Sequence, residues 1–448
     1  MRLQKKLLVV ALACAFPLGS AFAQSAADLK KEIEALKAQL QLLQKKVEDI
    51  SQAADTTPLS QQVNRIEQKM DLADNAAAES GFQGMKINGV VETALSYNNA
   101  DGSNTAAFNA TSGYGGDATS AGYGMIQITK ESQDGEGVDW TLRLLPGVAT
   151  LVHEASISVP LTKERRLIAG YMPDFQGYEY SFPHADSTLG NQLITHNALF
   201  ELAGATAYTG AGMSYSLDGG NAAFKWMIGN VDAGYDSAVD NVDPVNGANS
   251  SVKTVALAYR ADWYIGDASY VALSGLHGSM NRNFTIMAID GGVTRGDWQL
   301  NGQMTAGQQA RAAANGGEAK WTGVSGFVGF KVVPRLQLMA RADYIWNRDN
   351  GGGTYYYNGG DSSSVVGIGP KRTDSTGSID LDADTGYATT GANLTRLTFG
   401  TNYQINSNTQ WKTEYRLDLS DGYNFLDYDG VTYRKDKTTI STALMLSF

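Results

Sequence analysis

The last eleven residues of the chain, 438 to 448, alternate strictly between two kinds of side chain. Successive side chains of a β-strand point to opposite faces, so this alternation predicts a strand with one apolar face and one more polar face. Such a strand needs an apolar environment on one side only. The apolar face carries Ile440, Thr442, Leu444, Leu446 and the terminal Phe448, and the other face carries Thr439, Ser441, Ala443, Met445 and Ser447.

The same period of two recurs along the chain from Gly84 onward. No segment after residue 23 is apolar over the roughly 20 residues that a membrane helix needs. A membrane-spanning chain would therefore have to be a closed barrel, the only kind of sheet that satisfies its backbone in lipid. We predict about sixteen antiparallel strands, near 84–97, 121–131, 137–146, 150–160, 164–172, 205–217, 221–230, 251–264, 267–276, 283–290, 296–304, 318–331, 334–347, 393–405, 408–419 and 438–448.

The predicted connections alternate between long and short. Outer-membrane barrels show this asymmetry, with tight periplasmic turns and extended outer loops. An even number of strands then places both ends of the barrel on the periplasmic side. The long connections are 98–120, 173–204, 231–250 and 348–392, the short ones are 132–136, 218–220, 265–266 and 406–407, and the link at 147–149 is short where a long one is expected.

The segment from Trp411 to Leu419 separates its side chains most clearly. One face carries Trp411, Tyr415 and Leu419, and the other carries lysine, glutamate, arginine and aspartate. A soluble β-sandwich also alternates, with its polar face outward, so alternation alone does not decide which face meets water. Loop asymmetry, the terminal Phe448, the export signal described next and strand-end aromatics favour an all-β transmembrane barrel over residues 81–448. Those aromatics are Tyr97, Trp263, Trp346 and Trp411.

Residues 1–23 have the pattern of a signal peptide. A basic start is followed by the apolar run 7–18 and by the small-x-small sequence Ala21-Phe22-Ala23. Cys14, the single cysteine of the chain, lies in this run. The mature chain would then have no cysteine, which excludes disulfides and thiolate metal sites. An alternative makes Cys14 a lipidation site.

Residues 24–80 have a helical period instead. Leu29, Leu36, Leu43 and Ile50 alternate with Ile33, Leu40 and Val47 at the 3.5-residue spacing of a coiled-coil seam. Pro58 interrupts the seam, and a shorter one follows. One helix cannot bury its own seam, so either copies of the chain associate or the two helices fold back as a hairpin. We expect self-association in the periplasm; a charged helix along peptidoglycan or the barrel mouth is the alternative.

Composition and motifs exclude several functions. The formal net charge is −11, and a nucleic-acid partner would need a basic surface. No Gly-x-Ser-x-Gly or His-Glu-x-x-His motif accompanies the four histidines, His153, His184, His196 and His277. Asp380-x-Asp382-x-Asp384 has calcium-loop spacing, but Thr385 stands where that loop has glycine. We therefore expect no enzyme, no catalytic residue, no cofactor and no metal site.

Taken together, the export signal, the terminal Phe448 and the sixteen strands make the chain resemble Gram-negative outer-membrane porins. It resembles OmpL-like and general porins over residues 84–448, and coiled-coil-bearing sugar or phosphate porins at its amino-terminal part. The resemblance implies an outer-membrane channel for passive diffusion of small hydrophilic solutes, surrounded by lipid and lipopolysaccharide, and a homotrimer. The alternative is a structural or adhesive barrel that tethers the envelope by binding peptidoglycan through its coiled coil.

In porins the third outer loop folds inward and narrows the lumen; here that loop is 173–204. Arginines facing acids of this loop would set a transverse field that selects solutes by charge and size. The alternative is that these groups pair locally inside a narrow or plugged barrel. Acidic outer loops favour neutral or mildly cation-preferring transport. The predicted constriction residues are Asp174, Glu179, Asp186 and Glu201, and the predicted pore-wall residues are Arg143, Lys225, Arg260, Arg341, Arg396, Lys412, Glu414 and Arg416.

Overall fold

The computed structural model describes most of the chain after Gln83. The predicted signal peptide and coiled coil lie outside the described residues, as do Asp174, His184 and Asp186. The described residues are 84–99, 107–109, 123–132, 137–144, 152–173, 175–179, 192–203, 207–232, 253–279, 283–310, 313–315, 317–349, 352, 369–384, 386, 388–427 and 429–448.

Sixteen strands of six or more residues form one antiparallel sheet, and each of them overlaps a predicted strand. Among the described helices none is long and apolar enough to cross a membrane. The sixteen strands are β1 (Met85–Asn98), β3 (Tyr123–Lys130), β4 (Asp139–Leu144), β5 (Val152–Thr162), β6 (Arg165–Pro173), β7 (Ala207–Leu217), β8 (Ala222–Asp232), β9 (Lys253–Tyr264), β10 (Ser269–Gly278), β11 (Phe284–Arg295), β12 (Trp298–Gln309), β13 (Ala319–Val333), β14 (Leu336–Trp346), β15 (Leu394–Asn406), β16 (Thr409–Ser420) and β19 (Asp436–Ser447).

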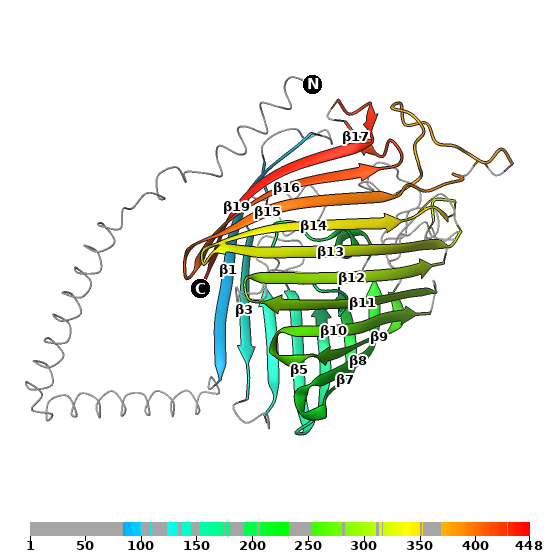
Figure 1. The fold of residues 1–448 in the computed structure, drawn as a ribbon. Coiled ribbons are helices and arrows are strands. Elements are labelled where there is room, and N and C mark those ends of the chain that lie inside the picture. Colours follow the sequence, from blue (N-terminus) through cyan, green and yellow to red (C-terminus); the bar gives the residue numbers. More distant parts are fainter. Residues whose placement is uncertain are drawn as a thin grey trace, which may run out of the picture. The chain divides into compact units, whose positions relative to one another are not determined.

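The sheet closes on itself, as Figure 1 shows. β19 pairs with β1 from Val90↔Ser447 to Asn98↔Thr439, and the other side of β1 pairs with β3. The short strand β2 (Ala107–Asn109) pairs with β1 beyond the end of β3. β2 and β3 therefore occupy the same strand position of the barrel, next to β1. A closed sheet leaves no unpaired edge, which is the condition for a β-protein to span lipid.

The apolar stripe of the strands faces outward. In β19, Ile440 and Leu444 are 44 and 49 % exposed, whereas Ser441 and Ala443 are 3 and 2 % exposed. The terminal Phe448 exchanges backbone hydrogen bonds with Gly89 at 2.9 and 3.0 Å, which fixes the end of the chain to the first strand. The strand-end aromatics Tyr97, Trp263, Trp346 and Trp411 are also exposed outward. The alternation is therefore that of a lipid-facing barrel and not of a sandwich.

Tight turns gather at one end of the barrel. The 3₁₀ turns η1 (Asp218–Gly220) and η2 (Gly266–Ala268) join β7 to β8 and β9 to β10. Gly219 has a φ of +63°, the left-handed conformation that glycine adopts without strain. The terminal Phe448 lies at this end too, because Ser447 N donates to Asn408 O in the tight turn between β15 and β16, and Gly89 of β1 is bonded to Phe448.

Structured outer segments cap the other end of β15, β16 and β19. β17 (Phe425–Leu426) pairs with β18 (Tyr433–Arg434), and the Arg372 guanidinium lies 4.3 Å from the ring centre of Tyr433. Figure 1 shows β17 beyond the ends of the long strands. The sequence did not predict these two short strands, because each has only two residues and no measurable period.

Candidate functional site

The segment between β6 and β7 is packed against the inner wall. It includes the short helix α4 (Ala198–Ala203). All residues from Leu193 to Leu199 are buried. A side-chain carbon added at Gly323 of β13 would lie 2.0 Å from Leu199, so this glycine is what lets the helix approach the wall. The described parts of the third outer loop, 173–204, therefore lie inside the barrel, as the resemblance to porins implies.

Arg341 of β14 is the first anchor of this segment. Its guanidinium donates hydrogen bonds to the carbonyl oxygens of Thr195 (2.9 Å) and His196 (2.6 Å), and its Nη1 lies 2.9 Å from Glu179 Oε1. Asp343, two residues along the strand, lies 3.3 Å from Arg341 Nε. The Arg341 side chain is fully buried. One cation thus holds both described parts of the inserted segment.

Carboxylates of the wall bind the backbone N–H groups of the same segment. Glu414 Oε2 accepts from Ile194 N (2.8 Å) and Thr195 N (3.0 Å), and Glu414 Oε1 accepts a short bond from the Thr195 hydroxyl. Asp343 accepts from Ala198 N (2.9 Å) at the start of α4. A segment without a sheet partner has backbone groups that would otherwise be buried unsatisfied. The wall side chains supply those partners.

Arg260 of β9 is the second anchor. It binds Asp290 of β11 through two parallel bonds of 2.8 and 2.9 Å and Asp262 at 2.8 Å. The same guanidinium donates to the carbonyl oxygens of Phe175 (2.9 Å) and Gly177 (3.3 Å). It therefore fixes the beginning of the inserted segment to the wall.

Arg396 and Arg416 share one carboxylate. Asp418 lies 2.6 Å from Arg396 and 2.9 Å from Arg416, and Arg396 also donates to His196 O at 3.2 Å. The His196 ring stacks on Phe200, with ring centres 4.3 Å apart, so this histidine packs within the segment.

The described cations and carboxylates at the inserted segment are equal in number. Lys412, buried in β16, interacts electrostatically with Glu92 and Glu414. The seven cations are Lys225, Arg260, Arg341, Arg396, Lys412, Arg416 and Lys437, and the seven carboxylates are Glu92, Glu179 of the segment itself, Asp262, Asp290, Asp343, Glu414 and Asp418.

A second polar row lies on the inner faces of β3 to β6. Arg143 lies 3.2 Å from Glu154 and donates to Gln127 Oε1 at 2.8 and 3.0 Å. Arg166 binds Asp139 at 2.5 Å, and these two side chains are 21 and 32 % exposed. Arg143 is thus buried like the anchors on β9 and β14 to β16, whereas Arg166 and Asp139 remain partly open to solvent.

The inner wall also carries an apolar patch that the sequence did not predict. Leu276, Ile286, Trp321 and Ile345 face inward and are buried in one cluster with Leu199 of the inserted segment. An inward side chain that contacts the inserted segment instead of water can be apolar. The prediction of a polar inner face is thus wrong for this part of the wall.

Of the predicted constriction residues, Glu179 contacts the wall through Arg341, and Glu201 falls within α4. Asp174 and Asp186 lie outside the described residues. The predicted wall residues share the inward parity of their strands: Arg143, Arg260, Arg341, Arg396, Lys412 and Glu414 are buried, and Lys225 and Arg416 are partly buried. Their role in a pore stays a prediction.

The wall arginines pair mainly with strand carboxylates that the sequence analysis did not single out. Three of these pairs have a signal in the sequence, because residues two apart share a face of a strand: Arg260 with Asp262, Arg341 with Asp343, and Arg416 with Asp418. Asp290 had no such signal, since its pairing with Arg260 depends on two strands that are separated by β10.

Comparisons with known proteins agree with this architecture. The outer membrane channel DcaP of Acinetobacter baumannii is 11 % identical, with a TM-score of 0.50 over 81 % of this chain and 97 % of that one. An anion-selective porin from Comamonas acidovorans is 10 % identical with a TM-score of 0.48, over 81 % and 99 % of the two chains. At 11 % identity the similarity to DcaP concerns the fold alone, a porin-type barrel. A search of curated proteins gave no match. One family model matches residues 52–268 and 231–448, and the chain therefore belongs to the family described as "Protein of unknown function (DUF3138)".

Proposed function

We propose that the chain is an outer-membrane channel for passive diffusion of small hydrophilic solutes. A sixteen-stranded barrel is wide enough to leave an aqueous channel. The observation that carries the proposal is the set of strands that hold the inserted segment. Its described polar and cation–π contacts lie on β8, β9, β13 and β14 to β16, while Arg166 and Asp139 in the polar row of β3 to β6 stay partly exposed. A solute would pass between the segment and this polar row.

The channel is expected to be neutral or mildly cation-preferring. The buried arginines are compensated by carboxylates, and seven described cations meet seven described carboxylates at the segment. Asp380, Asp382 and Asp384 are exposed on an outer segment. Carboxylates along a narrow path raise the local concentration of cations and repel anions. An anion-selective channel would need uncompensated cations there.

Assembly and surroundings complete the proposal. The heptad seam of residues 24–80 supports a homo-oligomer, a trimer by analogy with porins, with the helical segment in the periplasm and in reach of peptidoglycan. The outward apolar stripe supports contact with lipid and lipopolysaccharide.

Planar-bilayer recording of the purified full-length protein tests the proposal. We expect stepwise current increases, each of constant size, and a reversal potential in a KCl gradient that indicates equal or greater permeability for K⁺ than for Cl⁻. The absence of current steps from protein whose folding is verified by heat-modifiable gel mobility would contradict a channel. Co-sedimentation with peptidoglycan in that case would support the envelope tether instead.

A further inference from the structure

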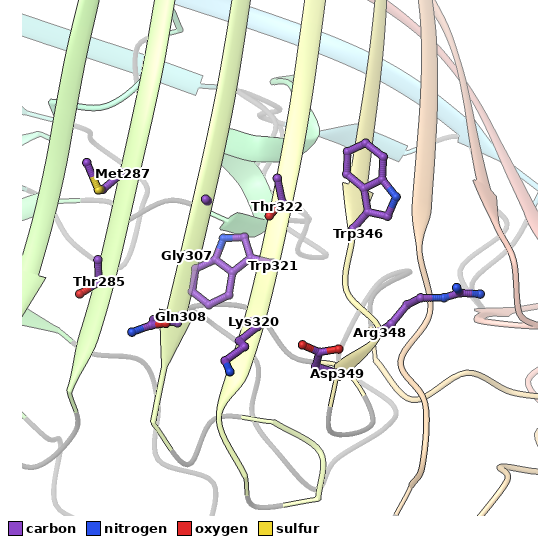
Figure 2. A pocket seen from close by; sticks show the side chains of 11 residues that line it. Thr285, Met287, Gly307, Gln308, Lys320, Trp321, Thr322, Trp346, Arg348 and Asp349 are labelled. Carbon is purple, nitrogen blue, oxygen red and sulfur yellow. The ribbon is translucent and has the colours of Figure 1, made fainter.

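The outer surface of the barrel carries a hollow across four neighbouring strands. It has a volume of about 580 Å³ and lies at the end of β11 to β14 away from the tight turns. Figure 2 shows its lining side chains on these strands and on the segment after β14. The lining residues used below are Met287, Ala306, Thr322, Trp346, Lys320 and Arg348.

The register explains why the surface is hollow. Met287, Ala306, Thr322 and Trp346 form one cross-strand row, because each is paired with the next. The two short side chains in the middle lie between a methionine and a tryptophan. The Trp346 ring is held edge-on against Tyr344, with ring centres 4.3 Å apart. The row is therefore a valley with a fixed aromatic wall.

The cross-strand pairs on either side of this row give the valley an apolar end and a polar end. Toward the middle of the strands, Met304 and Val324 are paired and exposed. Toward the loop end, Gln308 is paired with Lys320, and Arg348 follows β14. The Lys320 and Arg348 side chains are 50 and 62 % exposed. Apolar surface thus changes to cationic surface within a few residues, at the level of an exposed tryptophan.

The two cations have only loose acidic partners on the described chain. Lys320 lies 3.1 Å from the exposed Glu318, and Arg348 lies 4.0 Å from Asp421. Surface pairs of this kind contribute little energy, so both cations remain available to a stronger anion. Asp349 also lines the hollow, which leaves its lining with one excess positive charge.

From this arrangement we propose that the hollow binds one anionic lipid of the outer leaflet, with a head-group phosphate against Lys320 and Arg348. An acyl chain of the same lipid lies along Ala306 and Thr322 toward Met304 and Val324. Cationic side chains at a membrane surface attract phosphate, and a valley in a lipid-facing wall loses packing contacts unless a chain fills it. The inference rests on the proposed outer-membrane surroundings but not on channel activity, since it concerns the opposite face of the wall.

Native mass spectrometry of the refolded full-length protein tests the site, with lipid A bearing two phosphates as the probe. Replacing both cations in K320Q/R348Q should weaken its binding about tenfold or more. Ala306→Trp fills the valley without changing charge and should weaken binding as well. The matched control is K331Q/R335Q, which removes the same charge from exposed positions at the other end of the same strands; it should bind as the unchanged protein does.

Three results would overturn the proposal: binding by K320Q/R348Q equal to that of the control, full binding by Ala306→Trp, or equal binding of dephosphorylated lipid A. Heat-modifiable gel mobility verifies that each variant is folded. Bilayer recording of K320Q/R348Q should give unchanged current steps, so failure at this site and failure of the channel proposal are distinguishable.

Discussion

Arg341 Nη1 lies 2.9 Å from Glu179 Oε1, which joins strand β14 to the segment packed inside the barrel. The pair is buried, and the same guanidinium also holds the carbonyl groups of Thr195 and His196. This wall cation therefore joins both described parts of the inserted segment to β14.

Replacing Arg341 by glutamine should release the segment. The change leaves Glu179 and Asp343 buried without their cation, and breaking a buried ion pair in this way costs about 3–5 kcal/mol. We expect a lower unfolding free energy in urea titration and larger, noisier current steps in planar bilayers. The control is Arg335→Gln at an exposed position. Unchanged step size and noise in the Arg341 variant would show that the segment does not narrow the path.

Glu414 should control the local stability of the segment near Thr195. Its carboxylate accepts from two backbone N–H groups and one hydroxyl. Glutamine keeps one oxygen but loses the charge, and hydrogen bonds to a charged group contribute about 1.5–3 kcal/mol. Hydrogen exchange at Ile194 and Thr195 should therefore accelerate roughly ten- to hundredfold in Glu414→Gln. Equal exchange rates would refute this anchor, and β19 amides provide the internal reference.

The outward stripe should be sensitive to charge in a depth-dependent way. Phe399 and Ile405 both lie in β15 and are 55 and 42 % exposed, but Phe399 lies mid-strand and Ile405 at the register shift near the strand end. Arginine at a mid-membrane position costs about 2–4 kcal/mol and near the interface about 0–1 kcal/mol. Relative to the alanine variants, Phe399→Arg should destabilise the barrel in lipid vesicles more than Ile405→Arg does. Equal costs would argue against lipid contact.

The turn at Asp374, in an outer segment, should lose its stabilising hydrogen bonds only in strong acid. Hydrogen bonds from Thr376 and Ser378 lower the pKa of the Asp374 carboxyl from its ordinary 3.8 to about 2. A lowered pKa stabilises the turn above the ordinary value, and this stabilisation is lost as the pH falls through about 2. The amide NMR shift of Ser378, which donates to Asp374 at 3.1 Å, should follow that pKa. Thr376→Val should raise it toward 3.8; a midpoint unchanged in that variant would contradict the assigned cause.

The sequence predicted the strands well because each strand has one environment per face. In β16, Trp411 and Tyr415 face outward while Lys412 and Glu414 face inward, and an alternation this strong needs no knowledge of the neighbours. The inward fold of the third outer loop, 173–204, was implied by the resemblance to porins. The alternation of side chains along each strand likewise predicted that Arg260, Arg341 and Arg396 face the inside of the barrel.

The features that the sequence did not predict depend on how the strands pair with one another and on which inner residues the inserted segment buries. The pairing of Arg260 with Asp290 joins strands β9 and β11, and no spacing along the chain encodes it. The apolar inner residues Leu276 and Ile286 were assigned no role, because their burial requires the inserted helix. The predicted transverse field likewise assumed that arginines face loop acids. In the described site this holds for Arg341 with Glu179, whereas Arg396 is compensated within the wall.

The most direct test of the channel compares two neighbouring positions of β5. Ser156 faces the polar inner row, where its hydroxyl donates to Glu154 at 2.8 Å, and Ile157 is exposed on the outward face. In a background with Cys14 absent, single cysteines at the two positions are treated with a water-soluble, positively charged thiosulfonate during bilayer recording. We predict that the reagent reduces the current steps of Ser156→Cys and leaves those of Ile157→Cys unchanged. No change at Ser156→Cys, or a change at Ile157→Cys instead, would contradict an aqueous path along the inner face.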